Sequence, residues 1–388
     1  MSRRRPSSRP GPASSPDLVL GDGIEAKFDG WPAAEPVDLW AKWVAKLRPL
    51  HEPRGRELGV LEGILASTYR VRRRGSEAAT LIQLVPFWSP HTNTFVFPWG
   101  EATVTLEDVG ILAGLPLAGR EPLYDYDRLD MQDLRALDAV RRGHVANQSD
   151  TTGWVEHFLL RRCSRRHDEE ELLEHGAFLS MWLSHFVLPA PPLGAVPAER
   201  VLPIAVRMAR GDMVALAPAV LASIYSDLTA LKRHFVWERR TDPPSVSSPM
   251  HILQLWVWER FPELRLRPSP ASIPGSSSSG GAAVVPRAAR WHDVGKEVEP
   301  GYVQAVFKAP GRFEWRPYGI RAQPLPSFAM CLHPCELVGM ESIEQHSPHR
   351  VARQLGFDQD VPGMITRLNT DSWEKAWETY NIGTRWEK

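Results

Sequence analysis

Apolar residues recur at helical spacing along most of the chain. One apolar stripe runs through residues 39–47, directly after Asp38, which can cap a helix, and a second runs through residues 58–69. Residues 172–188 are apolar on nearly every side, which is typical of a helix in the centre of a protein. Further stripes occur at 217–231 and 252–261. Strand patterns are sparse, so we expect a mainly α fold with a minor β-hairpin component.

The hairpin is expected within the string TNTFVFPWGEATVTL, residues 92–106. Phe95 and Phe97 alternate as in a strand with one buried face, and the same alternation returns at Val104 and Leu106. Pro-Trp-Gly at 98–100 can turn the chain between them.

The period then changes to that of a helix. Thr105 and Asp108 have the spacing of a capping box, and apolar residues continue at helical spacing to Gly114. Leu115 and Pro116 follow the glycine. The glycine can end the helix, the leucine can pack against its last turn, and the proline cannot continue it. We predict a brief helix held at both ends.

Residues 347–363, SPHRVARQLGFDQDVPG, repeat this arrangement. Ser347 can cap a helix whose first residue is Pro348, and Gly356 can close it in the left-handed conformation. Phe357 can then fold back onto Val351 or Ala352. The string predicts a second short helix held at both ends, with an architectural role.

Charged residues within this string allow two interpretations. Asp358 and Asp360 would share one side of an extended segment, where paired carboxylates could hold divalent ions for a nuclease or transposase. Arg350 and Arg353 stand close by as natural ion-pair partners. We favour structural pairing between the arginines and the aspartates.

Composition narrows the class of protein. The chain has 388 residues, 43% of them apolar, and a formal net charge of zero, which argues against attraction of its whole surface to nucleic acid or anionic membrane. Three cysteines are too few for the disulfide framework of a small secreted protein. No signal-peptide core follows the basic N-terminus, and no apolar run is long enough to span a membrane. We expect an intracellular protein without membrane partners.

The sequence predicts one large domain with two irregular parts. Residues 1–30 form a basic tail that we expect to be disordered, although its Arg3-Arg4-Arg5 run could serve in nuclear import. Residues 31–388 form the domain, interrupted by a flexible Ser-, Gly- and Pro-rich linker at about 264–290.

Four residues are candidates for a metal site. Cys331, Cys335, His346 and His349 form the pattern C-x3-C-x10-H-x2-H. Zinc fingers place longer spacings before and between the two histidines. We therefore expect buried cysteines beside capping or surface histidines, and no metal.

Two arginine clusters are candidates for contact with nucleic acid. They are Arg72, Arg73 and Arg74, and Arg161, Arg162, Arg165 and Arg166. Such clusters can neutralise phosphates, but they can equally stabilise the C-terminal ends of the helices that precede them. Nucleic-acid binding stays a hypothesis.

Three strings together resemble one family. These are TNTFVFPWGEATVTLEDVGILAGLPLAG, GAFLSMWLSHFVLP and SPHRVARQLGFDQDVPG, which occur in the order and at the approximate spacing seen in plant mobile domain proteins, including the maintenance-of-meristems group. The resemblance spans about Trp31 to Tyr380. Relatives usually continue beyond SWEKAWETYNI, so the resemblance also implies a truncated C-terminal end.

The resemblance implies a nuclear protein linked to meristem maintenance and to silencing of transposons or genes, with a phosphatase-like protein partner. Because the family also occurs in transposable elements, a transposon-derived nucleic-acid-binding or nuclease-associated role is the alternative. The family is often labelled aminotransferase-like, but a pyridoxal phosphate enzyme needs a Schiff-base lysine and a phosphate cradle. The lysines lie in charged or surface-like contexts without such a cradle. We expect no cofactor, no catalytic residue and a non-catalytic interaction module, in which the 15 tryptophans fill the core and anchor interfaces.

Overall fold

The structure is a computed structural model, and it describes residues 20, 24–32, 37–71, 75–122, 130–160, 168–189, 196–265, 285–294, 298–319, 328–361 and 372–382. Helices dominate this part of the chain, as predicted. The α-helices are α1 (Val37–Glu57), α2 (Leu61–Ala66), α3 (Gly75–Leu84), α4 (Leu106–Leu112), α5 (Asp130–Ala146), α6 (Thr151–Leu159), α7 (Asp168–Trp182), α8 (Leu202–Arg210), α9 (Leu216–Lys232), α10 (His251–Arg260), α11 (Pro300–Lys308), α12 (Phe328–Leu332) and α13 (Trp373–Ile382). Two π-helical turns, η2 (Leu183–Val187) and η4 (Arg233–Trp237), extend α7 and α9.

The strands are short and form three small sheets. They are β1 (Lys27–Phe28), β2 (Trp88–Ser89), β3 (Thr94–Phe97), β4 (Gly100–Ala102), β5 (Ser245–Val246), β6 (Cys335–Val338) and β7 (Ile343–His346). Strands β1 and β5 pair in parallel, whereas β2-β3-β4 and β6-β7 are antiparallel. The 3-10 helices are η1 (Val85–Phe87), η3 (Glu199–Val201), η5 (Pro262–Leu264), η7 (Arg287–Trp291), η8 (Pro310–Arg312) and η9 (Pro348–Leu355).

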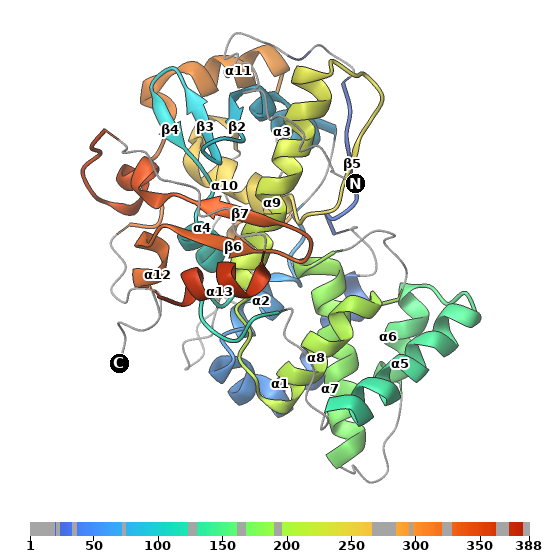
Figure 1. Ribbon diagram of the computed structural model, residues 1–388. Coiled ribbons are helices and arrows are strands. Elements are labelled where there is room, and N and C mark those ends of the chain that lie inside the picture. Colours follow the sequence, from blue (N-terminus) through green and yellow to red (C-terminus); the bar gives the residue numbers. More distant parts are fainter. Residues whose placement is uncertain are drawn as a thin grey trace, which may run out of the picture.

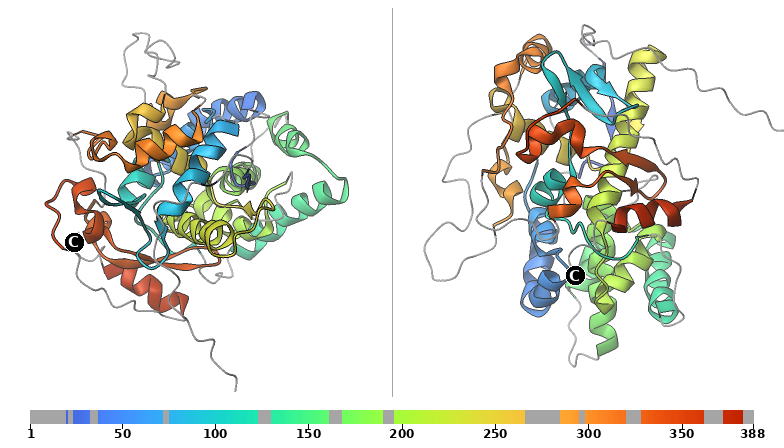
Figure 2. Two further views of the ribbon diagram at one scale, coloured as in Figure 1. Left: turned by 90° about the horizontal axis from the view of Figure 1, so that it is seen from above. Right: turned by 60° about the vertical axis from the view of Figure 1, so that its left-hand side comes forward.

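Helix α9 is the central element of the fold (Figure 1). It contacts α4, β2, β6 and β7, and the β6-β7 hairpin lies across it with α13 on the hairpin's side, as Figure 2 also shows. Helices α1, α2 and α5 to α8 gather at one end of the molecule, and the β2-β3-β4 sheet lies with α3 and α11 at the other. Segments from the whole chain therefore meet around one helix.

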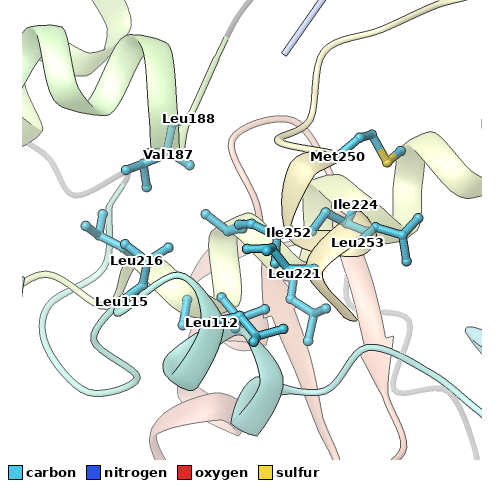
Figure 3. Close-up of a cluster of buried hydrophobic side chains, with 14 of the residues drawn as sticks. Leu112, Leu115, Val187, Leu188, Leu216, Leu221, Ile224, Met250, Ile252 and Leu253 are labelled. Carbon is cyan, nitrogen blue, oxygen red and sulfur yellow. The ribbon is translucent and has the colours of Figure 1, made fainter. Parts of the chain in front are cut away.

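The core is continuous along α9. Leu221 and Ile224 of α9 lie beside Ile252 and Leu253 of α10, and Leu112 at the end of α4 packs close to them (Figure 3). At least seven of the 15 tryptophans are less than 2% exposed: Trp43, Trp88, Trp154, Trp182, Trp256, Trp258 and Trp291. Each buries a large apolar area, so much of the tryptophan content stabilises the fold itself.

The hairpin is present but shorter than predicted. Phe95 pairs with Ala102 and Phe97 with Gly100, so the second strand ends before Val104. Leu106 already belongs to α4, because the capping box at its start takes the backbone out of the strand. The described residues include no helix that is both long and apolar enough to cross a membrane.

Most of the expected tail and linker lies outside the described residues. Of the linker predicted at about 264–290, the structure describes Leu264, Arg265 and residues 285–290. The last of these belong to η7, in which Ala288 and Ala289 are buried.

Candidate functional site

Helix α4 begins with the predicted capping box. The Thr105 hydroxyl accepts a hydrogen bond from the Asp108 amide at 3.3 Å, and Asp108 Oδ2 accepts one from the Thr105 amide at 2.9 Å. Gly114 follows the helix with φ +63°. The local sequence therefore places the Asp108 carboxylate, which is fully buried, at the positive end of a short helix.

Asp108 forms an interior ion pair with Arg260, the last residue of α10. Arg260 Nη2 lies 2.8 Å from Asp108 Oδ1, and neither side chain is exposed to solvent. The Tyr318 hydroxyl donates to the same oxygen at 2.6 Å, and Arg260 Nη1 donates to the Trp315 carbonyl. Two segments distant in sequence are thereby joined to the start of α4. Arg260 and Tyr318 were not predicted, because neither belongs to a local pattern.

A second ion pair lies next to the first. Glu259 accepts hydrogen bonds from Arg287 Nε and Nη2, both at 2.8 Å, and from the Trp291 indole at 3.0 Å. The Arg287 guanidinium also lies 5.3 Å from the centre of the Tyr318 ring. Consecutive residues of α10 thus hold η7 and the segment around Tyr318. We call Asp108, Glu259, Arg260, Arg287 and Tyr318 the ionic centre.

Burial and neighbouring charges shift the pKa values of two groups in the ionic centre. Burial alone would lower the pKa of Arg260, but the Asp108 carboxylate outweighs it and the pKa is raised. Burial, followed by the Asp108 charge, raises the pKa of Tyr318 far above its usual value. The arginine is kept charged and the tyrosine protonated, so these groups are held as permanent partners of the carboxylates. The arrangement locks four segments together.

The second predicted short helix differs from expectation at its start. Residues 348–355 form the 3-10 helix η9, with a break at Val351, and the Ser347 side chain makes no capping hydrogen bond. The prediction of a serine cap was wrong. The amide of Arg350, a natural donor for such a cap, already bonds to the Ser347 carbonyl oxygen at 3.1 Å, as 3-10 geometry requires. Pro348 lies at the first helical position, as predicted.

The end of η9 is closed as predicted. Gly356 has φ +90°, and the amide of Phe357 bonds back to the Ala352 carbonyl at 3.0 Å. This is the wider bond of a Schellman-type ending, which a left-handed glycine allows.

The arginines of the motif pair differently from the prediction. Arg350 Nε donates to Glu101 of β4 at 2.8 Å, and the Arg353 guanidinium lies 4.1 Å from the centre of the Trp315 ring. Asp358 and Asp360 lie beyond the Gly356 turn, exposed, and form no ion pair with a described residue. Local pairing was therefore wrong, because the turn separates the two groups and β4 supplies a carboxylate from elsewhere in the chain.

Gln354 makes a contact that sequence analysis missed. Its side-chain amide accepts from the Thr103 amide at 2.8 Å and donates to the Thr103 carbonyl at 2.9 Å. The side chain is 1% exposed. It satisfies both backbone polar groups of Thr103, just after β4, as a neighbouring strand would. A buried glutamine at this position gives no signal in a single sequence.

Replacing Gly356 with valine should destabilise the protein. A β-branched residue at φ +90° is strained, and its Cβ would lie 3.1 Å from the movable guanidinium of Arg316. We expect a loss of about 1–3 kcal/mol in unfolding free energy, measured by urea denaturation. Gly143→Val on α5 is the control, since its Cβ meets nothing within 4 Å and its φ is ordinary. An unchanged midpoint for Gly356→Val would contradict the role of this turn.

The four metal candidates lie in the described residues. Cys331 and Cys335 are buried free thiols, as predicted, and burial raises their pKa. His346 was expected at the surface or at a helix cap, but it is buried at the end of β7, and burial lowers its pKa to about 4. Within the described ranges, no three His, Cys, Asp or Glu side chains are arranged to hold a metal ion. His346 and His349 have ring nitrogens that are buried without a hydrogen bond of ordinary geometry, although the Cys331 backbone is near enough to favour protonation of His346.

A groove lies between α12 and η9. It has a volume of about 250 Å³ and is lined by Leu332, Pro348, His349, Ala352, Leu355 and Phe357. Phe357 is 51% exposed and Val361, on the same loop, 87%. We call this surface the motif groove.

Both arginine clusters proposed for nucleic-acid contact fall outside the described residues. This applies to Arg72, Arg73 and Arg74 and to Arg161, Arg162, Arg165 and Arg166.

Fold and site together define a mainly helical domain whose polar motifs are used to join distant segments. The chain belongs to the plant mobile domain family, whose model matches residues 59–387. No solved structure shows a significant match to it.

Two relatives from Arabidopsis thaliana are similar to this chain. One is named Serine/threonine-protein phosphatase 7 long form homolog and is 27% identical over 337 residues, covering 78% of this chain and 23% of that protein. Protein MAINTENANCE OF MERISTEMS is 34% identical over 77 residues, covering 19% of this chain and 16% of that protein. The chain therefore spans less than a quarter of the length of these relatives.

Proposed function

We propose that this chain is a non-catalytic protein-interaction module that acts in the nucleus, in meristem maintenance and in silencing of transposons or genes, with a phosphatase-like protein as partner. The observation that carries the proposal is the motif groove. The name of one relative supports the role in meristem maintenance, and the name of the other mentions a phosphatase.

Three polar residues of η9 have structural partners within the protein. Arg350 is paired with Glu101, Arg353 is stacked on Trp315 and Gln354 is bonded to Thr103. The groove beside η9 is lined mainly by apolar residues, and Phe357 is exposed at its edge. Exposed apolar surface beside a rigid element is typical of a protein-interaction site.

The ionic centre supports the non-catalytic part of the proposal. An enzyme needs a titratable or nucleophilic group that can reach substrate. Asp108 and Arg260 are fully buried and bonded to one another, and Glu259 is 1% exposed and bonded to Arg287. Their charges stabilise the fold.

Affinity purification of the tagged chain from plant nuclei tests the proposal. We expect recurrent protein partners, among them a phosphatase-like protein, that remain bound at moderate salt. Recovery of nucleic acid without any protein above background would overturn the interaction role. Hydrolysis of p-nitrophenyl phosphate by the pure chain, above a heat-denatured control, would overturn its non-catalytic part.

A further inference from the structure

The motif groove has the chemistry to bind a single apolar side chain. Five of its six lining residues are apolar, and three of these, Pro348, Ala352 and Leu355, lie on the short helix η9, whose Gly356 turn fixes the position of Phe357. Burying the exposed faces of Phe357 and Val361 would be favourable, at about 25 cal/mol per Å² of apolar area. A Leu or aromatic side chain of a partner suits such a surface.

His349 gives the groove a polar contact point. Both of its ring nitrogens are buried without a hydrogen bond, although the residue lines the groove. Buried polar atoms without a partner are uncommon in folded proteins. Burial lowers the pKa of His349, so its imidazole is neutral, with one ring nitrogen that can donate and one that can accept a hydrogen bond. The backbone of a bound segment would supply that partner.

The loop beside the groove carries negative charge that no described cation neutralises. The Asp358 and Asp360 carboxylates are exposed, and the one hydrogen bond to either among the described residues joins Asp360 to the amide of Val361. The nearby arginines already have partners within this chain. Arg350 is paired with Glu101 and Arg316 donates to the Gln354 carbonyl, while Arg353 covers Trp315. Positive charge on a partner would therefore be complementary to this edge of the groove.

We propose that the motif groove binds a segment of a partner protein that carries one large apolar side chain flanked by lysine or arginine. The apolar side chain enters between α12 and η9, a backbone group bonds to His349, and the basic residues lie over Asp358 and Asp360. This inference rests on the proposed function, because its occupant is a protein.

Selection of random 12-residue peptides on the immobilised full chain tests the inference. We expect the enriched peptides to combine a Leu or aromatic residue with lysine or arginine within a few positions. Synthetic versions should bind less tightly as salt concentration rises, because exposed charge pairs are screened. Enrichment of acidic or uncharged peptides, or no enrichment, would overturn the proposed chemistry.

Matched variants locate the binding. Phe357→Ser and the double variant D358K/D360K change exposed residues, and each should weaken peptide binding by roughly tenfold or more. The controls are Leu160→Ser, directly after α6 at a side chain 69% exposed, and Glu156→Lys within α6. Helix α6 lies far from α12 and η9 in Figure 1. The controls should bind like the unmodified chain. Equal binding by all variants would overturn the assignment to the groove.

The two proposals fail in different ways. If nuclear proteins bind Phe357→Ser and the unmodified chain equally, the interaction role stands and the groove assignment falls. If no nuclear protein binds the unmodified chain, the proposed function falls first. Concentration-dependent dimerisation that Phe357→Ser abolishes would show a second copy in the groove and would overturn the basic-peptide assignment.

Discussion

An Arg260→Met variant is expected to lose about 3–5 kcal/mol of unfolding free energy. The methionine fills similar space but leaves the Asp108 carboxylate buried at 0% exposure, with the Thr105 and Tyr318 hydrogen bonds but no cation. It also leaves the Trp315 carbonyl without the donor it had. Desolvation of an unpaired charge dominates the loss, and guanidinium chloride denaturation followed by tryptophan fluorescence measures it.

A double variant separates charge from packing. In D108N/R260M the asparagine keeps an oxygen for the Thr105 amide, while no unpaired charge stays buried. We expect it to be more stable than Arg260→Met alone, although the added substitution removes a further wild-type group. Arg48→Met is the surface control, because its pair with Glu52 is 39% and 25% exposed, and it should change stability by less than about 1 kcal/mol. A loss for Arg260→Met as small as that of Arg48→Met would show that the ionic centre does not hold the fold together.

Local signals predicted the local structure well. The capping box of Thr105 and Asp108 depends on residues three apart, and the Gly356 ending depends on the last turn of η9 alone. Such contacts are determined by a few neighbouring residues, so one sequence suffices to find them. Ser347 is the exception, because 3-10 rather than α-helical bonding took the amide that it would have bound.

Contacts between distant segments could not be predicted. Arg350 and Glu101 are 249 positions apart, and Asp108 and Arg260 are 152 positions apart. A charged residue has many candidate partners at such separations, and nothing in one sequence ranks them. A single sequence therefore favours the local aspartates as partners of Arg350, although the folded chain offers it a carboxylate on β4.

The same limit applies to the candidate site. The apolar residues of η9 were visible in the sequence, but the groove also needs Leu332 of α12, whose place beside η9 depends on the fold. The exposure of Phe357 was likewise hidden, because an apolar residue after a closing glycine is usually expected to seal the helix. The surface that carries the proposed function thus emerges only when the segments meet.

Gly114 marks a place where two backbones touch. A Cβ built on Gly114 would lie 2.5 Å from the Gly63 amide nitrogen and 2.7 Å from the Glu62 carbonyl carbon. A Cβ on Gly63 would in turn lie 2.9 Å from the Gly114 carbonyl oxygen and 3.0 Å from the Trp182 ring. Helix α2 and the end of α4 are therefore as close as two glycines allow, directly beside a buried tryptophan.

Gly114→Ala should lower the unfolding free energy by about 2–5 kcal/mol. Two costs contribute, the strain of alanine in the left-handed conformation and the displacement of the backbone atoms that its Cβ would meet. Gly319→Ala isolates the first of these contributions, since its φ is +68°, against +63° at Gly114, and its Cβ would meet nothing within 4 Å. It should cost only about 1–2 kcal/mol. Equal losses in urea denaturation would mean that α2 can move away from α4 at little cost. A clearly larger loss of stability for Gly114→Ala would show that the contact between α2 and α4 is rigid. Such rigidity is needed if the buried polar groups on α4 hold the fold together.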